Sequence, residues 1–170
     1  MKNALSRPET RFGPGTGLFR NDHFQIAYAT TDMDRAVALF SERYGVKAFR
    51  QLAGPTPAGG QIRMEIGWAG GVMYELLWAE GPGAELFRAG LPASGFAIRP
   101  HHLGYHVPTA AAWDAVLEEI ERVGLEIVHR TNIPGFLQAV IVDHSELGHF
   151  LEYIFPEEGG VAFFETAPSN

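Results

Sequence analysis

Two histidines and two glutamates recur at matched positions in this 170-residue chain. His23 and His102 lie 79 positions apart, and Glu75 and Glu152 lie 77 apart. Each histidine precedes its glutamate by a similar interval, 52 and 50 positions. Surface charges without a shared role would not be expected to recur at the spacing of a repeat. We therefore expect these four side chains to meet in one site.

Two imidazoles and two carboxylates form a ligand set suited to borderline divalent ions such as zinc, nickel, cobalt, iron or manganese. The two carboxylate charges balance the charge of such an ion, and four protein ligands leave two octahedral positions for substrate oxygens. An ion held in this way polarises a carbonyl group and stabilises the negative charge that forms when a neighbouring C–H proton leaves. One divalent metal ion is thus the predicted cofactor.

Composition excludes several other functions. The chain has no cysteine, so thiol catalysis, disulfides and zinc–thiolate sites are ruled out. Its formal charge is −7 with no run of Lys or Arg, which argues against nucleic acid as a partner. No apolar run suits a signal peptide or a membrane span. A cytoplasmic protein without a membrane partner is the expectation.

The elements that must position the four side chains repeat along the chain. The pattern of apolar residues predicts a strand at 24–29, a helix at 30–45 and strands at 46–52, 61–69 and 72–79. The same order recurs as a strand at 101–107, a helix at 109–124 and strands at 125–130, 136–143 and 149–155. The sequence therefore predicts an α+β fold built from two βαβββ modules.

The modules divide the chain as follows. Residues 1–22 form an N-terminal arm, 23–80 the first module, 81–100 a connector, 101–156 the second module and 157–170 a C-terminal tail. Neither module is large enough to close its own core comfortably. We therefore expect a single domain in which both modules share one curved mixed sheet around a central metal site, with the tail as a surface extension.

Strand alternation assigns the remaining candidates. In the segment 101–107, Leu103, Tyr105 and Val107 are expected to cover a helix, which leaves His102 and His106 on the opposite face. His106 and Gln25 are candidates for contacting a ligand or the substrate, although a structural role is as plausible for each. His101 is expected to point away from His102 into solvent.

The segments 23–45, 72–79, 101–107 and 147–155 together resemble the vicinal oxygen chelate superfamily, which includes glyoxalases, bleomycin-resistance proteins and dioxygenases. The resemblance is greatest to glyoxalase I and methylmalonyl-CoA epimerase-like members. It implies metal ligands from the first and last strands of each module, here His23, Glu75, His102 and Glu152. It also implies proton abstraction next to a metal-chelated carbonyl, with Glu152 or Glu75 as the base.

The resemblance thus favours a metal-dependent isomerase, epimerase or lyase acting on a small organic or thioester substrate, assembled as a homodimer. Two alternatives remain on the same fold. One is an iron-dependent extradiol-type dioxygenase, against which the fourth ligand, Glu75, argues, because that chemistry prefers two histidines and one carboxylate. The other is a metal-free protein that binds a small molecule or drug.

Overall fold

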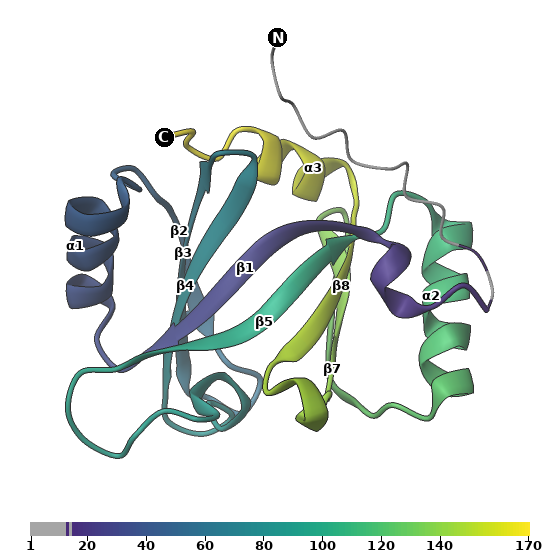
Figure 1. Cartoon of the computed structure of the whole chain (residues 1–170), viewed down its shortest axis with the longest axis horizontal. Helices are drawn as coiled ribbons and strands as arrows, with labels where there is room; N and C mark the ends of the chain where they lie inside the picture. Colours follow the sequence, from purple (N-terminus) through teal and green to yellow (C-terminus); the bar gives the residue numbers. More distant parts are fainter. Residues whose placement is uncertain (1–12, 14) are drawn as a thin grey trace, which may run out of the picture.

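The computed structural model describes residues 13 and 15–170, which form one mixed sheet of eight strands (Figure 1). The first module comprises β1 (Asp22–Thr30), α1 (Met33–Tyr44), β2 (Arg50–Pro55), β3 (Gln61–Ala69) and β4 (Val72–Glu80). The second comprises β5 (Ile98–His106), α2 (Ala110–Val123), β6 (Ile127–Ile133), β7 (Leu137–Val142) and β8 (Phe150–Pro156), and α3 (Glu158–Glu165) follows.

The strand order of the sheet is β2-β3-β4-β1-β5-β8-β7-β6. Each module therefore contributes half of the sheet, and from either edge inward its second, third, fourth and first strands follow in the same order. β1 pairs in parallel with β4, β5 pairs in parallel with β8, and β1 and β5 join the modules as an antiparallel pair. The sheet curls into a half-barrel, so the predicted α+β architecture of paired βαβββ units is confirmed.

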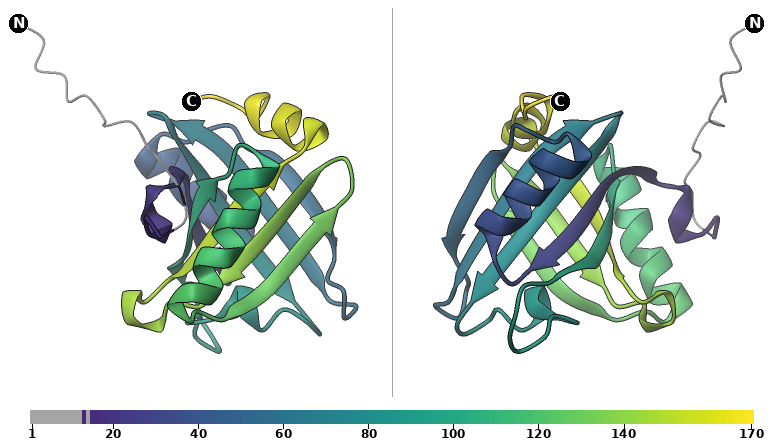
Figure 2. Two further views of the ribbon diagram at one scale, coloured as in Figure 1. Left: turned by 90° about the vertical axis from the view of Figure 1, so that its right-hand side faces the viewer. Right: turned by 60° about the vertical axis from the view of Figure 1, so that its left-hand side comes forward.

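The two long helices lie on the outer, convex side of the sheet (Figure 2). Each begins at a side-chain cap, Asp32 for α1 and Thr109 for α2, and each ends at a glycine in the left-handed conformation, Gly45 or Gly124. The apolar face of α2 packs against Tyr105 and its neighbours in β5 and β8, as strand alternation predicted. This packing leaves the concave side of the sheet free to carry a site.

Two segments depart from the predicted elements. β2 begins at Arg50 rather than at 46, because Val46 is buried against α1 as the chain leaves that helix. The segment expected as a surface tail instead contains α3, which lies across one end of the half-barrel (Figure 1). Phe163 and Phe164 of α3 pack on a buried cluster that includes Ile66 and Met73.

At the other end of the half-barrel, the connector between the modules folds back as a short 3-10 helix, η2 (Leu86–Arg88). Phe87 packs on a buried cluster formed by Ala27, Ala29 and Leu77. Among the residues that the structure describes, none of the helices combines the length and the apolar character needed to cross a bilayer.

Candidate metal centre

Three of the predicted ligands meet on the concave face of the sheet. Glu75 of β4, His102 of β5 and Glu152 of β8 each offer a donor atom, and these atoms lie within 4.8 Å of one another. His102 Nε2 is 2.9 Å from Glu152 Oε2 and 3.3 Å from Glu75 Oε2. Glu75 and His102 are buried, whereas the Glu152 side chain keeps 16% of its surface exposed.

Gln25 of β1 completes the group. Its Nε2 donates a 3.0 Å hydrogen bond to Glu75 Oε2, and its Oε1 is buried with no hydrogen-bond partner in the structure. The residue is only 2% exposed. Gln25 was predicted to contact ligand or substrate from this face, but it lies directly against Glu75, in the position expected for the fourth metal ligand.

The structure does not bring His23 to this cluster. Its Nε2 atom instead lies 3.0 Å from the backbone oxygen of Gln25, and its ring packs on Tyr105 on the α2 side of the sheet. The cause is a bulge: His23 pairs with Tyr105 and Gln25 with Gly104, which leaves Phe24 as the extra residue in β1. A bulge moves the following side chains to the opposite face, so His23 and Gln25 do not share a face as alternation predicts.

Gly104 provides the space that the Gln25 side chain occupies. A Cβ at position 104 would lie 2.8 Å from the Cβ of Gln25, well inside the 3.5–4.0 Å or so at which carbon atoms pack. Glycine is therefore the residue that allows β1 and β5 to bring Gln25 beside Glu75 and Glu152.

The expectation that His101 is exposed is wrong, and a second bulge explains why. Ala27 pairs with His102 and Tyr28 with Pro100, so His101 is the extra residue in β5 and turns inward, where it is 1% exposed. Its Nδ1 lies 2.8 Å from His102 Nδ1, and its Nε2 lies 3.1 Å from the carbonyl oxygen of Leu86 in η2.

This chain of contacts fixes the tautomer of His101 and the orientation of the His102 ring. The oxygen of Leu86 can only accept, so Nε2 of His101 carries the hydrogen and Nδ1 of His101 accepts from His102. Burial, together with His102, lowers the pKa of His101 to about 3, which keeps that ring neutral. His102 therefore donates through Nδ1 and presents Nε2 to the two carboxylates, as a metal-binding histidine must.

The electrostatics of the cluster call for a cation. Burial raises the pKa of Glu75, against the opposing effect of His102. Burial lowers the pKa of His102, but the carboxylates of Glu152 and Glu75 outweigh it and raise that pKa to about 10. Two carboxylates thus converge on one buried imidazole, and they favour positive charge between them.

The geometry and chemistry of these residues suit a divalent ion. His102 Nε2 faces the two carboxylate oxygens of Glu152 and Glu75 at 2.9 and 3.3 Å, and the neighbouring Gln25 has a buried Oε1 without a hydrogen-bond partner. One nitrogen and three oxygen donors, two of them anionic, suit zinc, nickel, cobalt, iron or manganese. The set differs from the predicted one by a single exchange, Gln25 in place of His23.

The cluster opens onto a cavity of about 130 Å³ between the walls of the half-barrel. Its walls are otherwise mainly apolar and come from β2, β3, β6, β7 and α3. His106 does not line it. His106 lines a neighbouring cavity of about 200 Å³ with Phe24, Trp68 and Glu165, so the structure does not place it beside the cluster.

A signal for Gln25 was present in the sequence. Gln25 and His102 are 77 positions apart, the same interval that separates Glu75 from Glu152. The helix caps Asp32 and Thr109 keep this interval too. The interval of 79 that separates the two histidines recurs at the C-terminal ends of the helices, between Gly45 and Gly124. It is two longer there because α2 has 14 residues and α1 has 12.

Comparisons with known proteins agree with this architecture. Neither a protein-family model nor a curated protein sequence matches the chain. Methylmalonyl-CoA epimerase from Mycobacterium tuberculosis is similar in structure, with a TM-score of 0.60 and 14% identity over 83% of this chain and 91% of the epimerase.

Two further structures are similar at a TM-score of 0.55. A variant methylmalonyl-CoA epimerase from Streptomyces coelicolor, in complex with 2-nitronate-propionyl-CoA, is 16% identical and covers 79% of this chain and 96% of its own. The hypothetical protein BH1468 from Bacillus halodurans C-125 is 17% identical, and the match covers 81% of this chain and 96% of that protein. The resemblance seen in the sequence is confirmed at the level of the fold, which this chain shares with these methylmalonyl-CoA epimerases.

Proposed function

We propose that this protein is a metal-dependent isomerase or epimerase that moves a proton on a carbon next to a carbonyl group. The observation that carries the proposal is the convergence of Gln25, Glu75, His102 and Glu152 beside a largely apolar cavity. The fold shared with methylmalonyl-CoA epimerases supports it. A small-molecule substrate follows, and the predicted homodimer remains a prediction that sedimentation velocity checks.

The four side chains would hold one divalent ion, which acts when bound as a Lewis acid on the carbonyl oxygen of a substrate. Gln25 contributes an amide oxygen, His102 contributes Nε2, and the two glutamates contribute negative charge. The contacts from Leu86 through His101 keep Nε2 of His102 directed at the site.

Glu152 is the better placed of the two glutamates to act as the base. Glu75 is buried and tied to the Gln25 amide, whereas the side chain of Glu152 is 16% exposed and lines the cavity. Glu152 takes the proton, and the electron pair of the C–H bond moves toward the carbonyl oxygen. Protonation of the same carbon on its other face by a second donor such as water, with the Glu152 proton passing to solvent, gives an epimer. Transfer of the Glu152 proton to the former carbonyl carbon, with the proton of the adjacent hydroxyl moving to the other oxygen, gives an isomer.

The same first step yields a lyase when a leaving group occupies the next carbon. An iron dioxygenase of the extradiol type fits less well, because that chemistry prefers two histidine ligands and the described cluster contains one.

Hydrogen exchange tests the proposal. Protein loaded in turn with Zn²⁺, Ni²⁺, Co²⁺, Fe²⁺ and Mn²⁺ is incubated in D₂O with hydroxyacetone, 2-hydroxyacetophenone and methylmalonyl-CoA, and NMR follows loss of the proton next to the carbonyl. We expect exchange of at least one compound by the parent protein. Replacing the base in Glu152→Gln should slow it by about 100-fold or more, in line with general base catalysis.

Glu118→Gln is the matched control, because Glu118 is an exposed glutamate on α2 and should leave exchange unchanged. Metal content is measured on every sample. Exchange that persists in a metal-loaded Glu152→Gln protein would overturn the role of Glu152, and absence of exchange with every ion would overturn the proposed reaction.

A further inference from the structure

The cavity beside the cluster is small. Its volume of about 130 Å³ is below the range of roughly 300–1,000 Å³ that is typical of pockets for drug-sized ligands. An engineered protein cavity of about 150 Å³ is known to hold one benzene molecule. The space next to the four donors therefore suits a group of about one six-membered ring.

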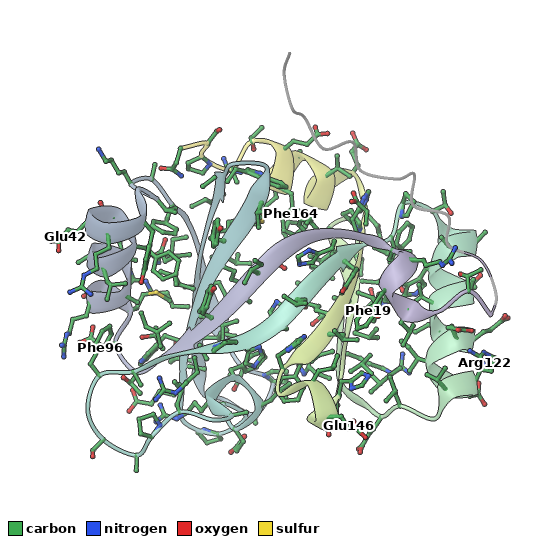
Figure 3. The ribbon with its side chains drawn as sticks, in the orientation of Figure 1. Phe19, Glu42, Phe96, Arg122, Glu146 and Phe164 are labelled. Carbon is green, nitrogen blue, oxygen red and sulfur yellow. The ribbon has the colours of Figure 1, made fainter. Side chains whose placement is uncertain are left out.

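Aromatic side chains from two separate segments set one wall of this cavity. Phe163 of α3 meets Phe136, from the turn between β6 and β7, edge to face with ring centroids 5.3 Å apart. Both line the cavity, together with Phe164, which lies between α3 and the sheet (Figure 3). α3 follows the second module, so it closes the cavity from outside both βαβββ units.

Hydrogen bonds fasten α3 to the first module. Arg50 of β2 donates to the carbonyl oxygens of Phe163, at 2.7 Å, and Thr166, at 2.5 Å. Trp68 Nε1 donates to the carbonyl oxygen of Phe164 at 2.9 Å, and the Asn170 side chain accepts from the backbone N–H groups of Lys47 and Ala48. The helix is therefore a fixed wall rather than a free extension.

The cavity offers no cationic side chain. No lysine or arginine is among its described lining residues. Of the arginines on β2 and β3, Arg50 is engaged with α3, and Arg63 pairs with Asp34 and Glu65. Phosphates are held by such cations, so the cavity itself offers no partner for a phosphate group.

We propose that this cavity selects a compact substrate without phosphate groups, about the size of one six-membered ring, and that Phe163 and Phe136 exclude bulkier acyl groups and coenzyme A thioesters. The proposal rests on the proposed function, since it concerns the substrate of the same cluster. The apolar wall receives the rest of the substrate.

Binding of hydroxamates, which chelate a metal ion through two adjacent oxygens, tests the size limit without relying on turnover. Calorimetry on the Ni²⁺- or Co²⁺-loaded protein compares acetohydroxamate, benzohydroxamate, 2-naphthohydroxamate and 2-nitronate-propionyl-CoA. The first two should bind. The naphthyl compound should bind about 10- to 100-fold more weakly, because overpacking a fixed apolar site costs about 1–3 kcal/mol, and the thioester should bind no more tightly than the naphthyl compound.

Two variants on opposite sides of the aromatic contact, Phe163→Ala and Phe136→Ala, should each admit the naphthyl compound at the affinity of benzohydroxamate. Val161→Ala, an exposed position on the same helix, should preserve the parent ranking. Using both phenylalanines keeps the test decisive if one variant folds poorly.

Equal binding of all four probes to the parent protein, or an unchanged ranking in both phenylalanine variants, overturns the size limit. Exchange of methylmalonyl-CoA in D₂O overturns it too, while leaving the proposed proton transfer intact. Failure of every hydroxamate to bind the metal-loaded protein removes both proposals.

Discussion

A single extra residue in a strand decides which side chain enters the cluster. The bulge at Phe24 turns His23 toward Tyr105 and leaves Gln25 beside Glu75. The bulge at His101 turns that ring inward as the support of His102. Bulges re-aim side chains at functional sites, and in this chain they decide which side chains enter the candidate metal cluster.

Replacing Gln25 and His23 separately tests this selection. Gln25→Ala should weaken the binding of Zn²⁺ by at least about tenfold, because it removes a donor and leaves the Glu75 carboxylate without its amide partner. His23→Ala should leave the affinity within about twofold, with a loss of stability of about 1 kcal/mol from the aromatic contact with Tyr105. Competition with a chromophoric chelator measures both affinities.

The opposite ranking, with Zn²⁺ affinity lost in His23→Ala and kept in Gln25→Ala, would restore the ligand set first expected from the sequence. Both variants leave Glu75, His102 and Glu152 in place, so the comparison isolates the fourth donor.

Glu75, His102 and Glu152 could be predicted from the sequence because the repeat marks them by spacing alone. The place of Gln25 required a choice of alignment. Pairing histidine with histidine gives an interval of 79, whereas the glutamates and the helix caps share an interval of 77, and it is the interval of 77 that leads from His102 to Gln25. His101 could not be placed, because a bulge depends on pairing with a distant strand.

At the scale of the elements, local sequence patterns predicted the helices and strands of both modules well, but they did not predict α3, which closes one end of the half-barrel. Caps and amphipathic spacing mark α1 and α2. α3 carries two glycines and an acidic start, and its adjacent Phe163 and Phe164 lack helical spacing. Its formation depends on distant contacts with Arg50 and Trp68, which the local sequence does not encode.

Gly15 and Gly17 of the N-terminal arm are hydrogen-bonded to one carboxylate of α2. Glu119 accepts hydrogen bonds from the backbone N–H groups of Gly15 and Gly17 and from Arg122, which is labelled in Figure 3. These contacts, above all that with Arg122, lower the pKa of Glu119 to about 2, from an ordinary value of 4.5. The arm and the outer helix are therefore coupled through a charged group.

This coupling predicts a specific loss of stability in acid. A carboxylate whose pKa is lowered in the folded state stabilises the fold above its ordinary pKa, and that contribution is lost as the pH falls from about 4.5 to about 2. Glu119→Gln should therefore lose less stability between pH 5 and pH 3 than the parent in urea unfolding. Glu118→Gln should behave like the parent, and equal losses in all three proteins would contradict the coupling.

For the whole molecule, the proposed metal donors come from both modules. Gln25 and Glu75 belong to the first, and His102 and Glu152 to the second. The β1–β5 ladder joins the modules beside the cluster. The duplicated sequence predicted this shared arrangement because neither module closes a core by itself.

Metal binding should therefore stabilise the entire fold. At 100 times the dissociation constant, an ion that binds only the folded chain adds about 2.7 kcal/mol. For a chain of this size, that raises Tm by about 5–10 °C. Scanning calorimetry with and without Zn²⁺ measures the rise. His102→Ala should abolish it, Ca²⁺ should produce less because it prefers six to eight oxygen donors, and an unchanged Tm in saturating Zn²⁺ would contradict a site that spans the modules.

The division of donors between the modules also has a mechanical meaning. An ion held by two residues from each module would link the modules directly, so the modules could not separate without breaking bonds to the ion. A force applied across the β1–β5 seam would then meet a coordination bond in addition to the hydrogen-bonded ladder, and the loaded molecule would yield at a higher tension than the empty one.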